Sequence, residues 1–170
     1  MRIHAAWPCS LGVLFAALAL APAPLLAQNN AANITAMTVI APSLSVSATR
    51  NLDFGTLPQG TGPRVITASD PDAGEFSIGA LANASITLTF ALPTELSNGT
   101  GFAIPIDSWT GASSAPGPGI EFFTPSSSGS TVHVGTNGTA AVFLGARISP
   151  SPNQVPGNYS AVVSMTVAYN

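Results

Sequence analysis

The sequence predicts an all-β protein, a sandwich of short strands, on three observations. Apolar and polar residues alternate with a period of two in several segments, which is the pattern of strands with one buried face. Turn-forming residues are frequent, with 16 Gly and 15 Pro in 170 residues. Beyond residue 30, no segment shows the apolar spacing of an amphipathic helix. Many short strands separated by turns are typical of a β-sandwich.

Residues 1–27 are expected to be a secretory signal peptide that is removed. Arg2 and His4 give a polar start, residues 11–21 form an apolar run of signal-peptide length, and small residues lead to a cleavage site after Ala27. This run is shorter than the roughly 20 residues that cross a bilayer, and no later segment is long and apolar enough to cross one. We therefore expect export to the periplasm, and then to the cell surface or the medium.

The exported chain is expected to have an N-terminal extension and one domain. The single cysteine, Cys9, lies inside the predicted signal, so no disulfide would hold the domain together. Residues 28–41 are the candidate extension, and residues 42–170 are long enough to bury a core of their own.

The strands are expected where the alternation is clearest. They cover 34–50 with a break at Pro42, 52–57, 64–69, 75–81, 85–92, 102–110, 131–135, 139–148 and 158–170. Pro105 places 102–110 at a sheet edge or a bulge. Residues 111–119 are expected to be a flexible loop, and Asn137-Gly138 predicts a tight hairpin between its two flanking strands.

The C-terminal segment 158–170 has the most regular alternation in the chain. It contains no charged residue and no Pro, which are common means by which edge strands avoid pairing with other chains. The strand is therefore either central in a sheet or at an edge that another chain is meant to fill.

Composition excludes several classes of partner. Only 6% of the residues are charged, and the four basic residues, all Arg, stand against seven acidic ones. A basic surface for nucleic acid is therefore not expected, and neither is an electrostatically held membrane-surface segment.

Side chains that carry chemistry are scarce. His133 is the only His outside the predicted signal, and one His without Cys does not make a usual zinc site. No nucleophile in a recognisable context lies near it in sequence. We therefore expect no catalytic residue, no metal site and no cofactor, and predict that the chain is not an enzyme.

Two weaker patterns have ordinary structural explanations beside the functional ones. Residues 70–75 resemble the start of a calcium loop but lack its full ligand set, and an Asp-Pro turn explains the same residues. Asp107 and Trp109 are a weak glycan-binding candidate, through stacking on the indole and hydrogen bonds to the carboxylate. A Trp is more often buried as a core anchor.

The two ends of the domain resemble known families. Residues 44–57, LSVSATRNLDFGTL, place Leu52, Phe54 and Gly55 as in the L-x-F-G opening of spore coat protein U-like and archaic chaperone–usher fimbrial subunits. Tyr169 is penultimate and Gly157 is fourteenth from the end, as in the terminal strand of chaperone–usher pilus subunits. Most of the domain also resembles the secreted bacterial family called domain of unknown function 4402.

The resemblance implies an incomplete immunoglobulin-like sandwich that lacks its last strand. A strand from another chain would fill the gap by donor-strand complementation, in which backbone hydrogen bonds supply affinity. The residues implied for this pairing are Gly157, Tyr159, Ala161, Val163, Met165, Val167 and Tyr169. The implied partners are a periplasmic chaperone, an outer-membrane usher, and neighbouring copies or related subunits.

The candidate donor strand is the extension 28–41. Its possible pocket-filling residues are Ile34, Met37, Val39 and Ile40, of which the first and last fall on one face and the middle two on the other. Two functions stay open at this point. One is a non-enzymatic structural subunit of a bacterial surface fibre or coat. The alternative is a monomeric secreted β-sandwich that binds a surface or a glycan, with 28–41 paired within its own chain.

Overall fold

The protein is represented by a computed structural model that describes residues 35, 37–38 and 43–170. The expected signal peptide lies outside these residues, as do Ile34, Val39 and Ile40 of the candidate donor strand.

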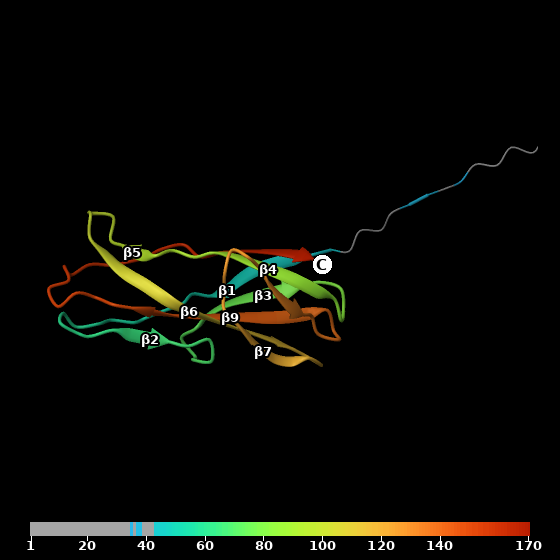
Figure 1. Cartoon of the computed structure of the whole chain (residues 1–170), viewed down its shortest axis with the longest axis horizontal. Coiled ribbons are helices and arrows are strands. Elements are labelled where there is room, and N and C mark those ends of the chain that lie inside the picture. The colour runs from blue at the N-terminus through green and yellow to red at the C-terminus, as the bar shows by residue number, and fades with distance from the viewer. Residues whose placement is uncertain (1–34, 36, 39–42) are drawn as a thin grey trace, which may run out of the picture. The chain divides into compact units, whose positions relative to one another are not determined.

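The described residues form strands in two antiparallel sheets (Figure 1). The strands are β1 (Ser45–Arg50), β2 (Arg64–Ile66), β3 (Gly74–Gly79), β4 (Ser85–Ala91), β5 (Glu95–Ser97), β6 (Ala103–Ala115), β7 (Gly119–Phe123), β8 (Ser130–His133), β9 (Thr139–Ile148) and β10 (Ser164–Tyr169). The main sheet has the order β1-β3-β9-β6-β5, with β2 also on β9 and β7 also on β6. The second sheet has the order β10-β4-β8. The predicted all-β sandwich is confirmed. Over the same residues, no helix is long and apolar enough to cross a membrane.

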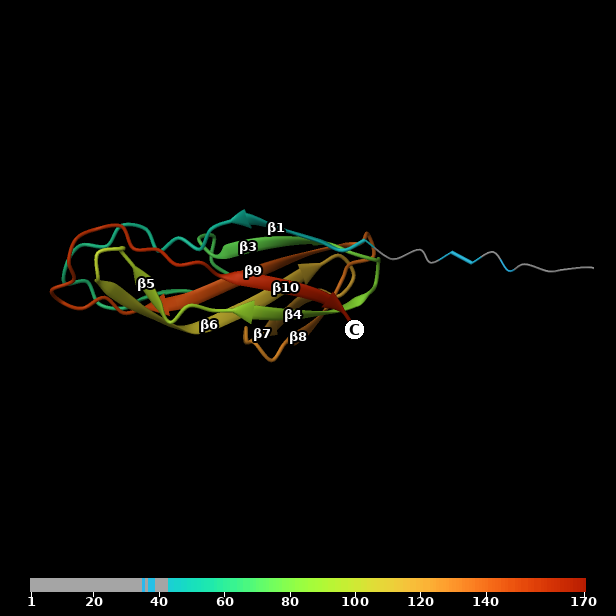
Figure 2. The same cartoon turned by 90° about the horizontal axis from the view of Figure 1, so that it is seen from above.

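The core lies between the two sheets, as the period-two alternation requires. In β4, Ile86, Leu88 and Phe90 are buried, while the Thr residues between them are partly exposed. Leu144 and Val142 of β9 meet them from the main sheet. Figure 2 shows the second sheet, with β10 in red, in front of the main sheet.

One polar side chain of the core has no partner. The hydroxyl of Ser113, on β6, is buried without a hydrogen bond in the part of the chain that the structure describes. Ser113 pairs in register with Val142 of β9, so its side chain lies on the core face of the main sheet.

The expected hairpin at Asn137-Gly138 is wrong. β8 pairs with β4 in the second sheet, while β9 pairs with β3 and β6 in the main sheet, so the intervening turn carries the chain from one sheet to the other. Gly138 still has the positive φ, 80°, that such a turn needs. The local signal for a turn was therefore correct, but the pairing of the flanking strands depends on distant partners.

The region 102–119 also differs from expectation. β6 continues through Ala115 and turns directly into β7, so most of the predicted flexible loop is strand. β6 is not an edge strand there, because it pairs with β9 on one side and with β5 and β7 on the other. The predicted bulge is present, although it lies at Asp107–Thr110, just after Pro105.

Three predicted strands are shorter or absent, and the segment 64–69 keeps only the three residues of β2. Residues 52–57 form no strand. Of the segment 158–170 only β10 is regular, and Ser160 makes an isolated bridge to Ser97. The segment 158–170 is regular only from Ser164 because its partner β4 ends at Ala91, two residues before Pro93, and a proline cannot continue the ladder of hydrogen bonds.

His133 lies at the edge of the sandwich where β7 approaches β8. Its backbone N–H donates to Oε2 of Glu121 at 3.2 Å, and its Nδ1 lies 2.8 Å from Oε1 of the same carboxylate. A carboxylate of the main sheet, that of Glu121, therefore accepts a hydrogen bond from an N–H group at the edge of β8. This edge of the second sheet is thus partly covered.

Candidate functional site: an open groove between β1 and β10

The opposite edge of the sandwich is open. Among the described residues β1 pairs only with β3 and β10 only with β4, so neither strand has a backbone partner on its outer side within this part of the chain. The two strands meet at one end, where the hydroxyl of Tyr169 donates to the carbonyl of Ser43 at 3.1 Å. From that end β1 runs away from Tyr169 and β10 runs toward it, so the two are antiparallel across the gap. Figure 1 shows β10 along the upper margin of the domain, ending at the C-terminus.

The exposed backbone groups of β10 belong to its inward-facing residues. The N–H of Asn170 donates to the carbonyl of Ser85, so the backbone groups of Asn170 point toward β4. In an antiparallel pair the backbone groups of successive residues point alternately toward the partner strand and away from it. The N–H and C=O groups of Met165, Val167 and Tyr169 therefore point to the open edge. The side chains of these three residues pack against the core and are partly buried. A strand placed beside β10 could pair with these backbone groups, and its own inward side chains would then lie next to the apolar side chains of Met165, Val167 and Tyr169.

β1 presents a matching uncovered residue. Val46 pairs in register with Ile78, so both side chains lie on the core face of the main sheet. Ile78 is fully buried, yet Val46 is 45% exposed, because no described residue of the second sheet covers it. We call the space between β1 and β10 the groove.

The groove widens into a cavity at the end away from Tyr169, and both apolar and polar residues line it. The cavity has a volume of about 850 Å³. Apolar side chains from β5, β6, β9 and the loops line much of it, among them Phe54, Leu57, Leu96, Ile104, Trp109 and Ile148. A space of this size among aliphatic and aromatic side chains suits other apolar side chains.

The L-x-F-G motif builds the floor of this cavity. Leu52 and Phe54 pack in the second core cluster and line the cavity. The Gly55 N–H donates to Oδ1 of Asp53 at 2.8 Å, which closes a tight turn, and Gly55 has a φ of 68° that favours glycine. The motif residues thus act as a turn with two apolar anchors.

The segment before β10 forms one wall of the cavity. Tyr159 packs against the second core cluster, and its hydroxyl donates to the carbonyl of Val155 at 2.7 Å. Gln154 donates to the same hydroxyl at 2.9 Å. Gly157, Ala161 and Val163 also line the cavity; Val163 is partly buried there, whereas Gly157 and Ala161 are exposed.

A β-bulge in β6 aims Trp109 at the cavity. Asp107 pairs with Arg147 of β9, and the next registered pair is Thr110 with Gly145. Arg147 donates twice to Asp107, from Nε to Oδ1 and from Nη2 to Oδ2, both at 2.9 Å. These bonds, together with one from the Ser108 hydroxyl, lower the pKa of Asp107, and the pair raises the pKa of Arg147. The structure does not bring Asp107 and Trp109 together, because only Trp109 lines the cavity.

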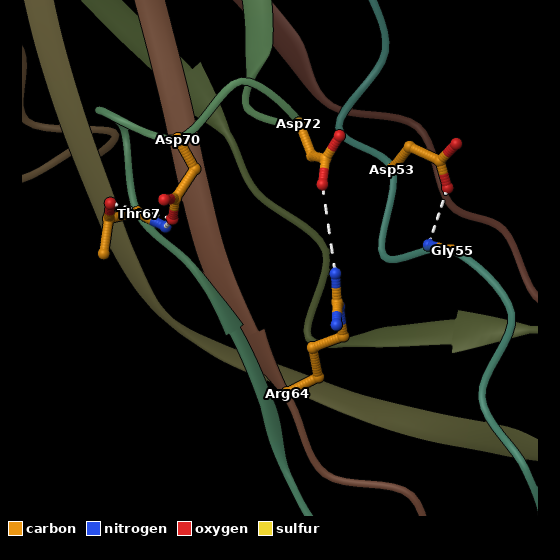
Figure 3. Close-up of polar contacts among 6 residues, drawn as sticks. All are labelled: Asp53, Gly55, Arg64, Thr67, Asp70 and Asp72. Carbon is orange, nitrogen blue, oxygen red and sulfur yellow. Dashed lines mark hydrogen bonds and ion pairs between the residues drawn. The ribbon is translucent and has the colours of Figure 1, made fainter.

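The acidic turn at 70–75 is held by bonds within the protein, and its carboxylates have separate partners (Figure 3). Asp70 accepts from the Thr67 N–H at 2.6 Å and from its hydroxyl at 2.9 Å. These two bonds lower the pKa of Asp70. Asp72 lies 3.9 Å from Nη2 of Arg64. Within the described ranges, no three acidic, His or Cys side chains are grouped as a metal site.

The β10 residues and the motif at 52–55 carry signals in the sequence, whereas the cavity and the inward position of Trp109 were not predicted. A signal for the latter was available. Apolar residues alternate at Ile104 and Ile106 and then resume at Trp109 and Gly111, a shift of one residue that indicates a bulge. Of the candidate donor residues only Met37 is described, and it is 87% exposed.

Comparisons with known proteins give the following matches. A family model described as Domain of unknown function (DUF4402) matches residues 44–169. None of the curated proteins compared matches the chain. Among solved structures, a chain of a chaperone–usher pilus studied for rod uncoiling is 18% identical, with a TM-score of 0.39, covering 87% of this chain and 100% of that one. A family 123 glycoside hydrolase from Clostridium perfringens is 16% identical, with a TM-score of 0.31, covering 77% of this chain and 25% of that one.

Proposed function

The chain belongs to the DUF4402 family, and we propose that it is a non-enzymatic structural subunit of a bacterial surface fibre or coat. Its copies would join by strand donation, with the extension 28–41 of one copy entering the groove of the next. The observation that carries this proposal is the groove itself. Two strand edges that pair with no other described strand flank it, and apolar side chains make up about half of the cavity at its wide end. Backbone pairing would supply affinity there, and alternate side chains would fill the cavity.

The distribution of apolar residues in the extension favours a donor from a second copy. Residues 28–33, QNNAAN, are mostly polar, and the apolar candidates lie between Ile34 and Ile40. The cavity lies at the end of the groove away from Tyr169. A strand that runs antiparallel to β10 brings Ile34–Ile40 to that end.

A strand folded back within the same chain would run the other way. It would have to turn at Ser43, beside Tyr169, and run parallel to β10. Its polar residues 28–33 would then lie against the apolar part of the cavity lining, where an amide that finds no partner is costly to bury. The chemistry of the two segments therefore supports pairing between copies over pairing within one chain.

The same edge suits the proposed assembly partners. Before a neighbouring copy arrives, a periplasmic chaperone would cover the free groups of β10, and an outer-membrane usher would pass the subunit on. Export through the signal at 1–27 would precede both steps. Covering β10 in this way would also prevent the unprotected edge from aggregating.

The first test is a denaturing gel of native surface extract, with boiled and unboiled samples side by side. Complemented strands dissociate slowly, so a ladder that collapses to one band on boiling is expected. Deletion of 28–41 should remove the ladder. A single band in both lanes would contradict assembly and favour the monomeric binding module.

Two neighbouring residues on opposite faces of β1 provide a matched pair of variants. Val46→Glu places a charge in the groove and should abolish the ladder, while Ser47→Glu, on the outer face, should leave it intact. A mixing experiment then tests donation between copies. The 28–41 deletion accepts but cannot donate, and Val46→Glu donates but cannot accept. When the two variants are mixed, they should form a dimer of one copy of each and no larger oligomer. Absence of that dimer would contradict donation between copies.

A further inference from the structure

We propose that Trp109 is the residue that determines which side chain a donated strand can place in the cavity. This inference rests on the proposed strand donation. It concerns selection within the groove and assigns Trp109 to the recognition of a partner segment, where its indole contacts the incoming side chain.

The bulge in β6 is what turns Trp109 inward. Ile106 lies on the core face and pairs with Ile148. With strict alternation from Ile106, Asp107 would face out, Ser108 in and Trp109 out to solvent. The extra residue of the bulge shifts this alternation by one, so Trp109 lines the cavity and packs against the second core cluster.

The bulge has an unfavourable backbone and is fixed on both sides. Ser108 has a φ of 51°, a left-handed conformation that non-glycine residues rarely adopt. Before it, Asp107 is held by the two bonds from Arg147. After it, the hydroxyl of Thr110 accepts the N–H of Ala68 at 3.2 Å. A strained residue that persists between two such ties indicates that the position of the next side chain matters.

The size of the indole complements the candidate donor strand. Residues 28–41 contain no aromatic residue, and their largest apolar side chains are Met and Ile. Trp109 is the largest side chain that lines the cavity, and it is only partly buried, so an incoming residue can contact it. Within a cavity of about 850 Å³ the indole would narrow the space beside it, so that an aliphatic side chain would fit against it better than a ring. A smaller residue at 109 would admit the ring.

The experiment measures this preference directly. The full chain is refolded from denaturant with an excess of labelled peptide of sequence 28–41. Competing peptides carry Phe at one of the four positions Ile34, Met37, Val39 and Ile40. With the wild-type chain, one of these substitutions should weaken competition by about tenfold or more. With Trp109→Leu, the same peptide should recover to within about threefold of the unmodified one, while the other three should keep their ranking.

Two further variants keep the test decisive. Phe122→Leu is the matched control, because Phe122 lies on β7 away from the groove and is 72% exposed, and it should leave every preference unchanged. Trp109→Phe should show the same recovery to a smaller degree, and it provides the answer if Trp109→Leu does not fold. An identical ranking of peptides in the wild-type and Trp109 variants would overturn the inference while strand donation stands. Failure of the unmodified peptide to bind the wild-type chain would overturn strand donation itself.

Discussion

The hydroxyl of Tyr169 is bonded to the carbonyl of Ser43, and it also accepts the N–H of Leu81 at 2.9 Å. One side chain at the end of β10 thus ties together the start of β1 and the loop between β3 and β4. The side chain of Tyr169 thus holds β1 and β10 together at this end of the groove, although no backbone hydrogen bonds join the two strands.

Tyr169→Phe should therefore lower the free energy of unfolding. The loss of these bonds at a partly exposed site is expected to cost about 1 kcal/mol. Urea denaturation measures it. Val162→Ala is the control, because Val162 is 82% exposed and its truncation should change stability by less than about 0.5 kcal/mol. Equal stability of Tyr169→Phe and wild type would show that the tie contributes nothing.

Gly145 is expected to tolerate no side chain. A Cβ there would overlap the carbonyl oxygen of Ile66 and lie 2.7 Å from the N of Ala68, both backbone atoms. Gly145→Ala should destabilise the domain by about 1–3 kcal/mol. Gly62→Ala is the matched control, since a Cβ there meets nothing within 4 Å and its φ is ordinary. It should be neutral or slightly stabilising. Thermal unfolding of both variants would test the contrast.

Ser113→Ala should stabilise the domain. The substitution removes a buried hydroxyl that has no hydrogen-bond partner among the described residues, and the gain is expected to be about 1 kcal/mol. Ser114→Ala, one residue along on the opposite and partly exposed face, should change little. Denaturant titrations would settle the point, and destabilisation by Ser113→Ala would indicate a partner for the hydroxyl.

Acid should weaken the turn at Asp70. Since the bonds from Thr67 hold its folded pKa below the ordinary value, the stabilisation is present above about pH 4 and is lost as pH falls through the folded pKa. Asp70→Asn should therefore lose less stability than wild type between pH 6 and pH 2. Thr67→Val, which removes only the hydroxyl donor, should be intermediate. Parallel loss of stability in all three chains would contradict this account.

Much of the fold was predictable because the alternation is local. The pattern of β4, with Ile86, Leu88 and Phe90 inside, follows from sequence alone, and so does the inward set from Val163 to Tyr169. The pairing was not predictable in the same way. The turn at Asn137-Gly138 joins two sheets, because β8 pairs with β4 while β9 pairs with β3 and β6, and these partners are distant in the sequence. The regular part of the last strand begins only at Ser164, because its partner β4 ends before Pro93.

The candidate site was predictable only at its margins. The β10 residues and the motif at 52–55 carried sequence signals, and both border the groove. The cavity did not, because it arises where segments far apart in sequence, such as Leu57, Trp109 and Tyr159, come together. The orientation of Trp109 depends on a single extra residue in β6, which reverses the face that simple alternation assigns to it.

The position of Ser43 has a mechanical consequence. If copies are linked through the residues that precede Ser43, tension on the assembly enters the domain at the start of β1 and acts along that strand. The hydrogen bonds between β1 and β3 lie across the strands. Such a load acts on all of them together in shear and does not peel them apart one by one. A fibre of these domains would therefore resist pulling through its strand ladders, without the disulfides that its sequence cannot provide.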